Sequence, residues 1–264
     1  MPSQEAIAPA GITAAIRGGN SKAHTRCLKP LINSGSLDKF NHADLTPVIG
    51  REFTGVQVVD FLVADQQLVD DLAITSKAGF VHLRTFVVFR AQDITPQQMK
   101  ELALRITEAG GAPESSGLHI HPLTEAGSEL GDQISVISSE KQKKGGGLTH
   151  QLSDVSRSAS AGWHSDITFE PVSSDYAMLK IHTLPASGGD TLQAEHPVIR
   201  TNPVTGWKSV FVNKGFTTRL NGVTKDESDL LLSYLFNIVR QNDDAQVRVK
   251  WSKNDLAIWD NRSN

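Results

Sequence analysis

The sequence predicts an α+β domain built as a double-stranded β-helix, or jelly roll, with flanking helices. Two observations support this prediction: several short segments are rich in β-branched and aromatic residues, and two amphipathic segments begin with helix-capping residues. Short strands with a few helices outside them are typical of this layered architecture. A chain of 264 residues is long enough to form one such domain with a substantial core.

The N-terminal segment, residues 1–40, is predicted to be a flexible tail. It is rich in Gly, Ser, Asn and Ala and shows no hydrophobic periodicity. Patterned sequence begins with residues 45–50 and 55–58. We therefore place the folded jelly-roll domain at residues 41–264.

The first strongly patterned strand is predicted within residues 80–90, which are dense in β-branched and aromatic side chains. A helix follows it. Thr95 is a good N-cap, Pro96 suits the first helical position, and apolar residues then recur at helical spacing as far as Gly110 and Gly111.

A second helix is predicted to begin after Thr224, because Thr224 and Glu227 have the spacing of a capping box. Three apolar residues share one face of this helix: Leu231, Leu235 and Ile238.

Two more strands are predicted near the C-terminal end of the sequence. In residues 246–251, Val247, Val249 and Trp251 alternate with polar residues, which is the period of a half-buried antiparallel strand. A turn at residues 252–255 then leads to a short apolar strand at residues 256–259.

Composition argues against several classes of partner. The net charge of -3 and the even spread of charged residues give no basic face that could neutralise phosphates, so we expect no nucleic-acid partner. No run of about 18 apolar residues could cross a bilayer, and residues 1–19 lack the pattern of a secretory signal. Cys27 is the only cysteine, which excludes an intramolecular disulfide. We therefore expect a cytoplasmic protein with no membrane partner.

The triplet His164-Ser165-Asp166 is the main candidate for chemistry. Side chains two positions apart on a strand point to the same face, so His164 and Asp166 would present an imidazole and a carboxylate side by side. Non-haem iron(II) oxygenases bind their metal through two histidines and one carboxylate. The triplet by itself is also compatible with a surface turn.

Several segments, in order along the chain, carry a resemblance to a known family. They are residues 93–98, 118–122, 163–166, 188–192, 196–201, 211–213 and 258–262. In composition and order they resemble the taurine dioxygenase family (TauD/TfdA), and especially its fungal sulfonate dioxygenase branch. The resemblance covers most of the chain from about Thr46 onward.

The resemblance implies an iron(II)- and 2-oxoglutarate-dependent dioxygenase. In such enzymes Fe(2+) binds 2-oxoglutarate, O2 is activated as the keto acid is decarboxylated to succinate and CO2, and a small organic molecule, such as a sulfonate, is hydroxylated. His164 and Asp166 are implied to be catalytic iron ligands. Thr191 is implied to donate its hydroxyl to the distal carboxylate of 2-oxoglutarate. Homodimers are common in the family, so a homodimer is one expected assembly.

Two further residues are implied to contact the substrate. His121 matches a residue that helps to hold a sulfonate, and Ile167 matches a position that lines the substrate pocket. Read without the family, Thr191 could cap a turn after Gly188 and Gly189, and His121 could be a partly buried loop histidine.

The sequence also departs from the family pattern. Family members have a second iron-binding histidine and 2-oxoglutarate-binding arginine shortly after the segment that matches residues 258–262, and several dozen residues between the segments that match 188–192 and 196–201. The sequence thus predicts an internal gap after Leu192 and an incomplete jelly roll. Thr124 and Ser160 stand where taurine enzymes have Tyr and Asn, so taurine itself is not the expected substrate.

Two alternatives to the enzyme follow from these departures. The chain could be a non-catalytic remnant, or a regulatory binding protein of the same fold, that lacks the distal histidine and arginine. It could also hold zinc or another metal with different chemistry, because two ligands do not select a metal.

Overall fold

The computed structural model describes residues 31–76, 85–112, 117–120, 130–136, 166, 174–182, 198–202, 204–212, 214, 217–242 and 246–261. Its strands are β1 (His42–Asp44), β2 (Arg51–Phe53), β3 (Phe86–Phe89), β4 (Tyr176–Lys180), β5 (Ile199–Thr201), β6 (Lys208–Val210) and β7 (Leu256–Asp260). Its helices are the 3-10 helix η1 (Val58–Leu62) and the α-helices α1 (Gln66–Thr75), α2 (Pro96–Ala109) and α4 (Lys225–Gln241).

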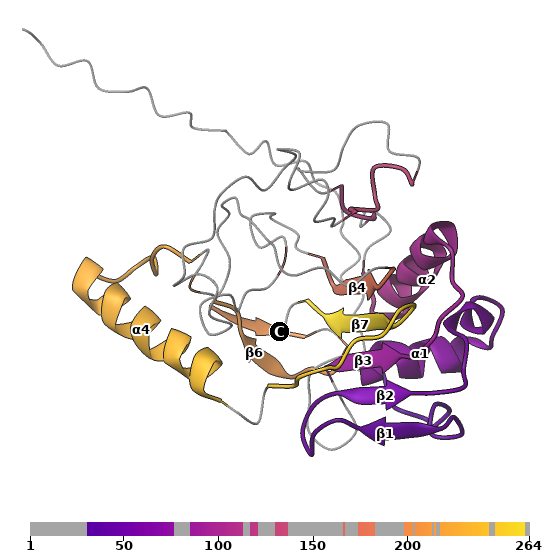
Figure 1. Ribbon diagram of the computed structural model, residues 1–264. Helices are drawn as coiled ribbons and strands as arrows, with labels where there is room; N and C mark the ends of the chain where they lie inside the picture. Colours follow the sequence, from indigo (N-terminus) through magenta and orange to yellow (C-terminus); the bar gives the residue numbers. More distant parts are fainter. Residues whose placement is uncertain are drawn as a thin grey trace, which may run out of the picture.

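Five of the strands form one mixed sheet in the order β1-β2-β3-β7-β4, which Figure 1 shows edge to edge. β2 and β3 are parallel, whereas β7 runs antiparallel to both of its neighbours, β3 and β4. The last strand of the described chain therefore lies inside the sheet, hydrogen-bonded on both edges. β5 and β6 form a separate antiparallel hairpin.

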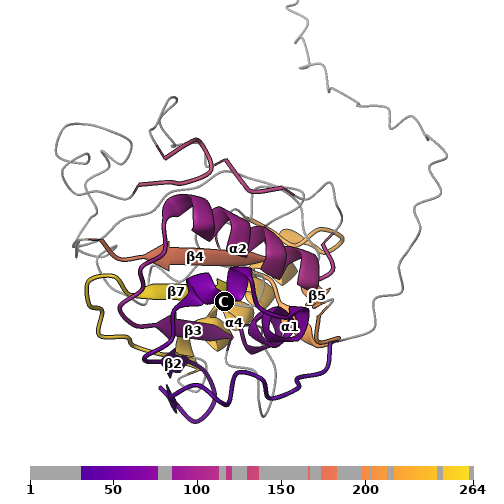
Figure 2. The ribbon, with the colours of Figure 1, turned by 90° about the vertical axis from the view of Figure 1, so that its right-hand side faces the viewer.

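α1, α2 and η1 cover one face of the sheet, and Figure 2 shows α1 and α2 in front of it. The hydrophobic core lies between these helices and alternate residues of the central strands, including Phe89 of β3 and Ile258 of β7. Phe53 stacks on Phe89 with ring centroids 4.9 Å apart, and Phe61 of η1 meets Phe89 edge-on at 5.9 Å. These offset and edge-on aromatic pairs add to the stabilisation from burial.

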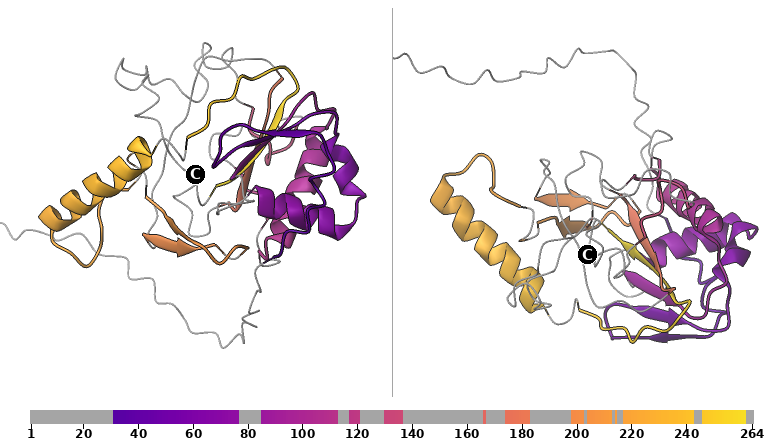
Figure 3. Two further views of the ribbon diagram at one scale, coloured as in Figure 1. Left: turned by 90° about the horizontal axis from the view of Figure 1, so that it is seen from below. Right: turned by 45° about the horizontal axis from the view of Figure 1, so that its top comes forward.

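The opposite face of the sheet looks toward the β5–β6 hairpin and α4 (Figures 1 and 3). Val88 of β3 and Ala257 of β7 are paired in the sheet and fully buried on this face. Phe86 contacts Trp251 and Trp259 here, each at 6.3 Å between ring centroids. Both faces of the central strands are therefore buried, which explains why residues 256–260 read as a nearly continuous apolar run.

Both predicted helices are confirmed, with their caps. Thr95 and Gln98 form a capping box at the start of α2, and Gly110 is the C-cap that ends the helix, as predicted. Thr224 and Glu227 form the predicted capping box of α4. In each case the hydroxyl accepts from the backbone N–H three residues on, and the longer side chain binds back to the N-cap amide.

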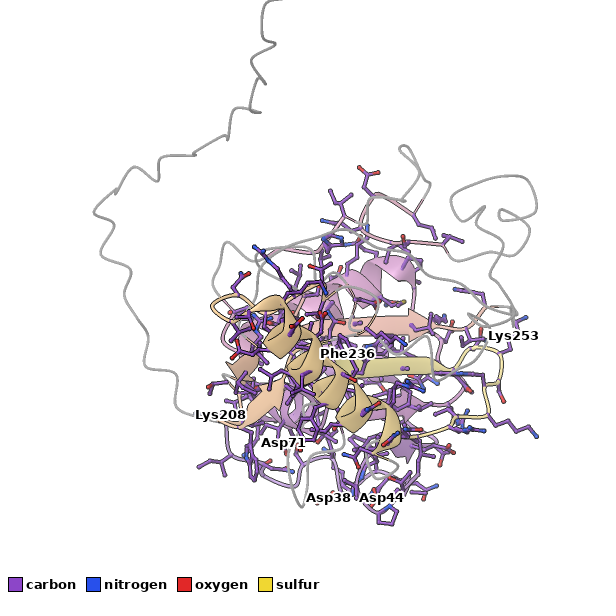
Figure 4. All side chains as sticks on the ribbon, turned by 90° about the vertical axis from the view of Figure 1, so that its left-hand side faces the viewer. Asp38, Asp44, Asp71, Lys208, Phe236 and Lys253 are labelled. Carbon is purple, nitrogen blue, oxygen red and sulfur yellow. The ribbon has the colours of Figure 1, made fainter. Side chains whose placement is uncertain are left out.

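The apolar face predicted for α4 is only partly buried. Leu231 is 43% exposed and Ile238 is 39% exposed, whereas Leu232 is 4% exposed and Ser228 is 2% exposed. The buried stripe is thus rotated by about one residue from the predicted one. Figure 4 shows α4 in front of the sheet, with Phe236 labelled on the helix.

The prediction of a strand at residues 246–251 is wrong, because these residues belong to no strand. Alternate burial persists, because Val247 and Val249 are half-buried and Arg248 and Lys250 are exposed. Alternating apolar and polar residues indicate which side of an extended segment is buried, but a strand also needs a neighbouring strand in hydrogen-bonding register. The Lys250 carbonyl accepts instead from the guanidinium of Arg90, at 2.8 Å.

The other expectations have mixed outcomes. The strand expected within residues 80–90 occurs as β3, Phe86–Phe89, and residues 77–84 lie outside the described residues. The strand expected at 256–259 is β7. Packed structure is present before residue 41, because Leu37 is only 3% exposed and joins the core.

The fold class α+β is confirmed by the mixed sheet and the helices outside it, and the double-stranded β-helix remains a prediction. Within the described part of the chain, no helix combines the length and the apolar character needed to span a membrane.

Candidate active site

Among the predicted site residues, only Asp166 is described by the structure. His164, Thr191, His121 and Ile167 lie outside the described residues, so their predicted roles stay predictions. The geometry of the candidate site is therefore built around Asp166 and the residues that bind its main chain.

The main chain of Asp166 is held on both sides by the side chain of Asn261. The Asp166 N–H donates to Oδ1 of Asn261 at 2.8 Å, and Nδ2 of Asn261 donates to the Asp166 carbonyl at 2.7 Å. The two residues are 95 positions apart in the sequence. Asp166 itself is half-buried.

Asn261 follows directly on β7 and is fully buried. Its Nδ2 also donates to the Ser174 carbonyl at 3.2 Å, and its own N–H donates to the Asp175 carbonyl at 3.1 Å. Ser174 and Asp175 precede β4, the neighbour of β7 in the sheet. The main chain of Asp166 is thus attached to the end of the inner strand β7, which is itself bound to the segment that leads into the edge strand β4.

Asp260, the last residue of β7, connects the end of this strand to the β5–β6 hairpin. Nδ2 of Asn202, which follows β5, donates to Oδ2 of Asp260 at 2.9 Å, and both side chains are buried. Oδ1 of Asn202 accepts from the N–H groups of Val204 and Thr205, at 2.9 and 3.3 Å. The Asp260 N–H donates to the Thr85 carbonyl at 3.1 Å. The end of β7 is therefore a junction of several segments.

The opposite end of β7 is fixed by a charged cluster. Asp255, 1% exposed, accepts from the Ser252 N–H at 2.7 Å, which closes the predicted turn, and forms an ion pair with Arg90. Arg90 also binds Glu52 of β2 at 2.5 Å. The hydrogen bond to Glu52, with the bond to Asp255, raises the pKa of Arg90 above its ordinary value despite the opposing effect of burial. Both ends of β7 are thus anchored.

The Asp166 carboxylate is a group of the kind that divalent metals bind. A carboxylate is a hard oxygen ligand, and an imidazole two residues earlier would complete the pair that iron(II) accepts. Within the described residues alone, no three His, Cys, Asp or Glu side chains gather around a common point. Asp166 is thus the one predicted ligand whose main-chain support the structure describes, and its role as a ligand stays a prediction.

Sequence reasoning assigned no role to Asn261. The signal was present, because Asn261 lies in the segment 258–262 that carries part of the family resemblance. A hydrogen bond between residues 95 positions apart has no local pattern that could reveal its partner.

An open cavity of about 260 Å³ is lined by residues of α4 together with Lys214, Thr217 and Thr218. It brings Lys214 and Arg240 together with Asp229 over an apolar floor that includes Phe236.

The fold is similar to those of solved dioxygenase structures. One is a taurine dioxygenase from Burkholderia xenovorans, with a TM-score of 0.56 and 22% identity over 85% of this chain and 80% of that chain. Another is AAD-2 in complex with Mn(II) and N-oxalylglycine, with a TM-score of 0.52 and 17% identity over 85% of this chain and 90% of that chain.

Sequence relatives agree with this class. The alpha-ketoglutarate-dependent dioxygenase btcD of Neocamarosporium betae is 33% identical over 89% of this chain and 86% of the relative. The alpha-ketoglutarate-dependent sulfonate dioxygenase of Saccharomyces cerevisiae is 26% identical over 83% of this chain and 60% of the relative.

The family model described as taurine catabolism dioxygenase TauD, TfdA family, matches residues 41–195 and 192–264. The chain belongs to this family, and by family it is an oxidoreductase of the 2-oxoglutarate-dependent dioxygenase class.

The matches also bear on the predicted internal gap. The two segments matched by the family model meet at residues 192–195, where the sequence predicts that family residues are missing. The alignment with btcD spans 301 positions, more than the 264 residues of this chain, so the relative has residues without a counterpart here.

Proposed function

We propose that this chain is an iron(II)- and 2-oxoglutarate-dependent dioxygenase that hydroxylates a small organic molecule, with release of succinate and CO2. Sulfonates are the substrate class that we favour, since one of the relatives is named a sulfonate dioxygenase. The observation that carries the proposal is the double attachment of Asp166, the candidate metal ligand, to the end of β7 in a chain of this family.

The residues of this chain have distinct parts in the proposal. The His164 imidazole and the Asp166 carboxylate hold Fe(2+), which when bound supplies the site where 2-oxoglutarate chelates and O2 reacts. Thr191 donates its hydroxyl to the distal carboxylate of 2-oxoglutarate, a charge-assisted hydrogen bond of the stronger class. His121 faces the anionic group of the substrate, and Ile167 lines the pocket.

Asp166 contributes more than a ligand atom. Its carboxylate offsets part of the charge of a divalent ion. Because its N–H and carbonyl are both bound by Asn261, the main chain at this position has little freedom to turn, so the carboxylate can move only about its own side-chain bonds. This limits the ordering entropy that metal binding must overcome.

The remaining parts of the proposal concern partners and place. We propose a small-molecule substrate, no nucleic-acid or membrane partner, a homodimer as the assembly, and the cytoplasm as the location. Size-exclusion chromatography with light scattering tests the assembly, and an elution mass of a single chain contradicts the homodimer.

The test of the proposed function is anaerobic addition of Fe(2+) and 2-oxoglutarate to the purified chain. Chelation of the metal by the keto acid gives a weak visible charge-transfer band, and O2 then yields succinate. Both signals should disappear in His164→Ala and in Asp166→Ala. His182→Ala is the matched control, because His182 is an exposed histidine at the end of β4 and should leave both signals unchanged. No band with the parent chain refutes the proposal.

A second candidate is favoured by the alignment, which leaves residues of btcD without a counterpart here. In this alternative the chain is a non-catalytic or regulatory binding protein of the same fold. It predicts binding of metal and 2-oxoglutarate, seen as the visible band, without succinate release when O2 is admitted. Tight binding of Zn(2+) without any band with Fe(2+) would instead favour a zinc site.

A further inference from the structure

We infer that Asn261 is a positioning residue whose carboxamide sets the main-chain geometry of Asp166 for metal binding. The inference rests on the proposed function, in which Asp166 is an iron ligand. It assigns to Asn261 no contact with the metal, with 2-oxoglutarate or with the substrate.

The chemistry of the contact requires an amide. A carboxamide offers one acceptor oxygen and two donor hydrogens, so it can bind a peptide N–H and a peptide carbonyl of the same residue. Asn261 uses all three groups: Oδ1 binds the Asp166 N–H at 2.8 Å, and Nδ2 binds the carbonyls of Asp166 at 2.7 Å and Ser174 at 3.2 Å. An aspartate here would have no donor for the two carbonyls.

The support is rigid because Asn261 is itself fixed. It is fully buried, its N–H binds the Asp175 carbonyl, and it follows a strand that is hydrogen-bonded on both edges. Ser174 and Asp175 lead into β4, so the carboxamide joins three segments: the end of β7, the start of β4 and Asp166. The backbone of Asp166 therefore has its place set by the sheet.

A ligand whose backbone is fixed holds its donor atom ready for the metal. Groups that orient a metal ligand without touching the metal are known to matter, and their removal typically weakens metal binding by roughly 10- to 100-fold. We expect a loss of this size when the carboxamide of Asn261 is removed.

The test compares Asn261→Leu with Asn202→Leu in the full chain. Leucine has nearly the shape of asparagine but no polar atom. Asn202 is the matched control because it is also a buried carboxamide bound to the end of β7, through Asp260, and does not bind Asp166. The affinity for Mn(2+) alone is measured from the free-ion electron paramagnetic resonance signal, and circular dichroism establishes that each variant is folded.

The inference predicts that Asn261→Leu weakens Mn(2+) binding by roughly 10-fold or more, whereas Asn202→Leu changes it by less than about 3-fold. Equal affinity in the parent and in Asn261→Leu overturns the inference. Equal affinity in the parent and in Asp166→Ala overturns the proposed metal site, and the role of Asn261 with it.

Hydrogen exchange on the parent chain gives a test that needs no variant. The Asp166 amide should be strongly protected, because its acceptor is buried and fixed. Exchange of this amide at the rate of an open chain overturns the inference even if Asn261→Leu does not fold. A protected Asp166 amide combined with Mn(2+) binding that does not depend on Asp166 would show that the contact is structural only. That result overturns the positioning role, and the part that failed is then the proposed metal site.

Discussion

Replacing Asp71 by asparagine tests how the chain segment before β1 is attached to the domain. Asp71 lies on α1, is fully buried, and accepts three hydrogen bonds from Ser34 and Ser36. The Ser34 N–H binds Oδ1 at 2.8 Å, while the Ser34 hydroxyl and the Ser36 N–H bind Oδ2 at 2.6 and 2.7 Å. This contact holds Leu37, 3% exposed, against the core.

The expected loss of stability follows from the hydrogen bonds that an asparagine side chain can still accept at this position. Asn in the same position keeps one oxygen for the Ser34 N–H but presents an NH2 group to the Ser36 N–H, so that donor keeps only its longer bond to the Ser34 hydroxyl, at 3.3 Å. Hydrogen bonds to a charged acceptor contribute about 1.5–3 kcal/mol each, and the change removes one such bond and the charge that strengthens the others. We expect Asp71→Asn to lower the free energy of unfolding by about 2–4 kcal/mol at pH 7.

The effect should depend on pH in a defined direction. Burial acts to raise the pKa of Asp71, but the hydrogen bonds from Ser34 and Ser36 outweigh it and lower the pKa below its ordinary value. A carboxyl with a lowered folded pKa stabilises the protein fully above its unfolded pKa, about 3.9, and loses this contribution as the pH falls through the folded pKa. The difference between parent and variant should therefore shrink below about pH 4.

The assay is urea denaturation at pH 7 and at steps down toward pH 3, on the parent and the variant. Asp70→Asn is the matched control: Asp70 is the preceding residue of α1, its bond from Gln66 is exposed, and its change should stay within about 0.5 kcal/mol. An Asp71→Asn variant as stable as the parent at pH 7, or a difference that grows as the pH falls, would refute the reasoning.

Three further changes probe the core, a helix start and the charged cluster. Phe89→Ala should cost about 3–5 kcal/mol in urea denaturation, because its ring is buried between Phe53 and Phe61; a loss under 1 kcal/mol would contradict this packing. Thr224→Ala should cost about 1 kcal/mol and lower the helical circular dichroism of α4, and no change would mean that the capping box is not formed in solution. Arg90→Met should cost about 2–4 kcal/mol in thermal or urea unfolding, because it leaves the buried Asp255 carboxylate without its ion pair, and a neutral result would show that Asp255 is satisfied by its backbone donors alone.

The sequence anticipated the features that depend on neighbouring residues. Both helices begin at the predicted caps, Thr95 and Thr224, since a capping box is completed within one turn of helix. β7 was visible as a short apolar segment because both of its faces are buried. At the candidate site the sequence singled out Asp166 and the segment that ends β7, but as separate motifs.

The errors came where a local pattern has two outcomes. Residues 246–251 alternate as a strand does, yet without a partner in register they form none. Leu231, Leu235 and Ile238 were predicted to share the apolar face of α4, but the residues of α4 that are fully buried are Ser228 and Leu232. A helix with apolar residues on more than one side does not itself determine which side meets the fold.

The sequence by itself determined the α+β fold class, the two capped helices and the family, and it singled out His164 and Asp166 as candidate ligands, which stays a prediction. Only the tertiary structure decided that β7 lies between β3 and β4, and that Asn261 binds both main-chain groups of Asp166. The physical reason is the range of the interaction. Caps and periodicity are satisfied within a few residues, whereas strand neighbours and a hydrogen bond across 95 positions depend on how the whole chain packs.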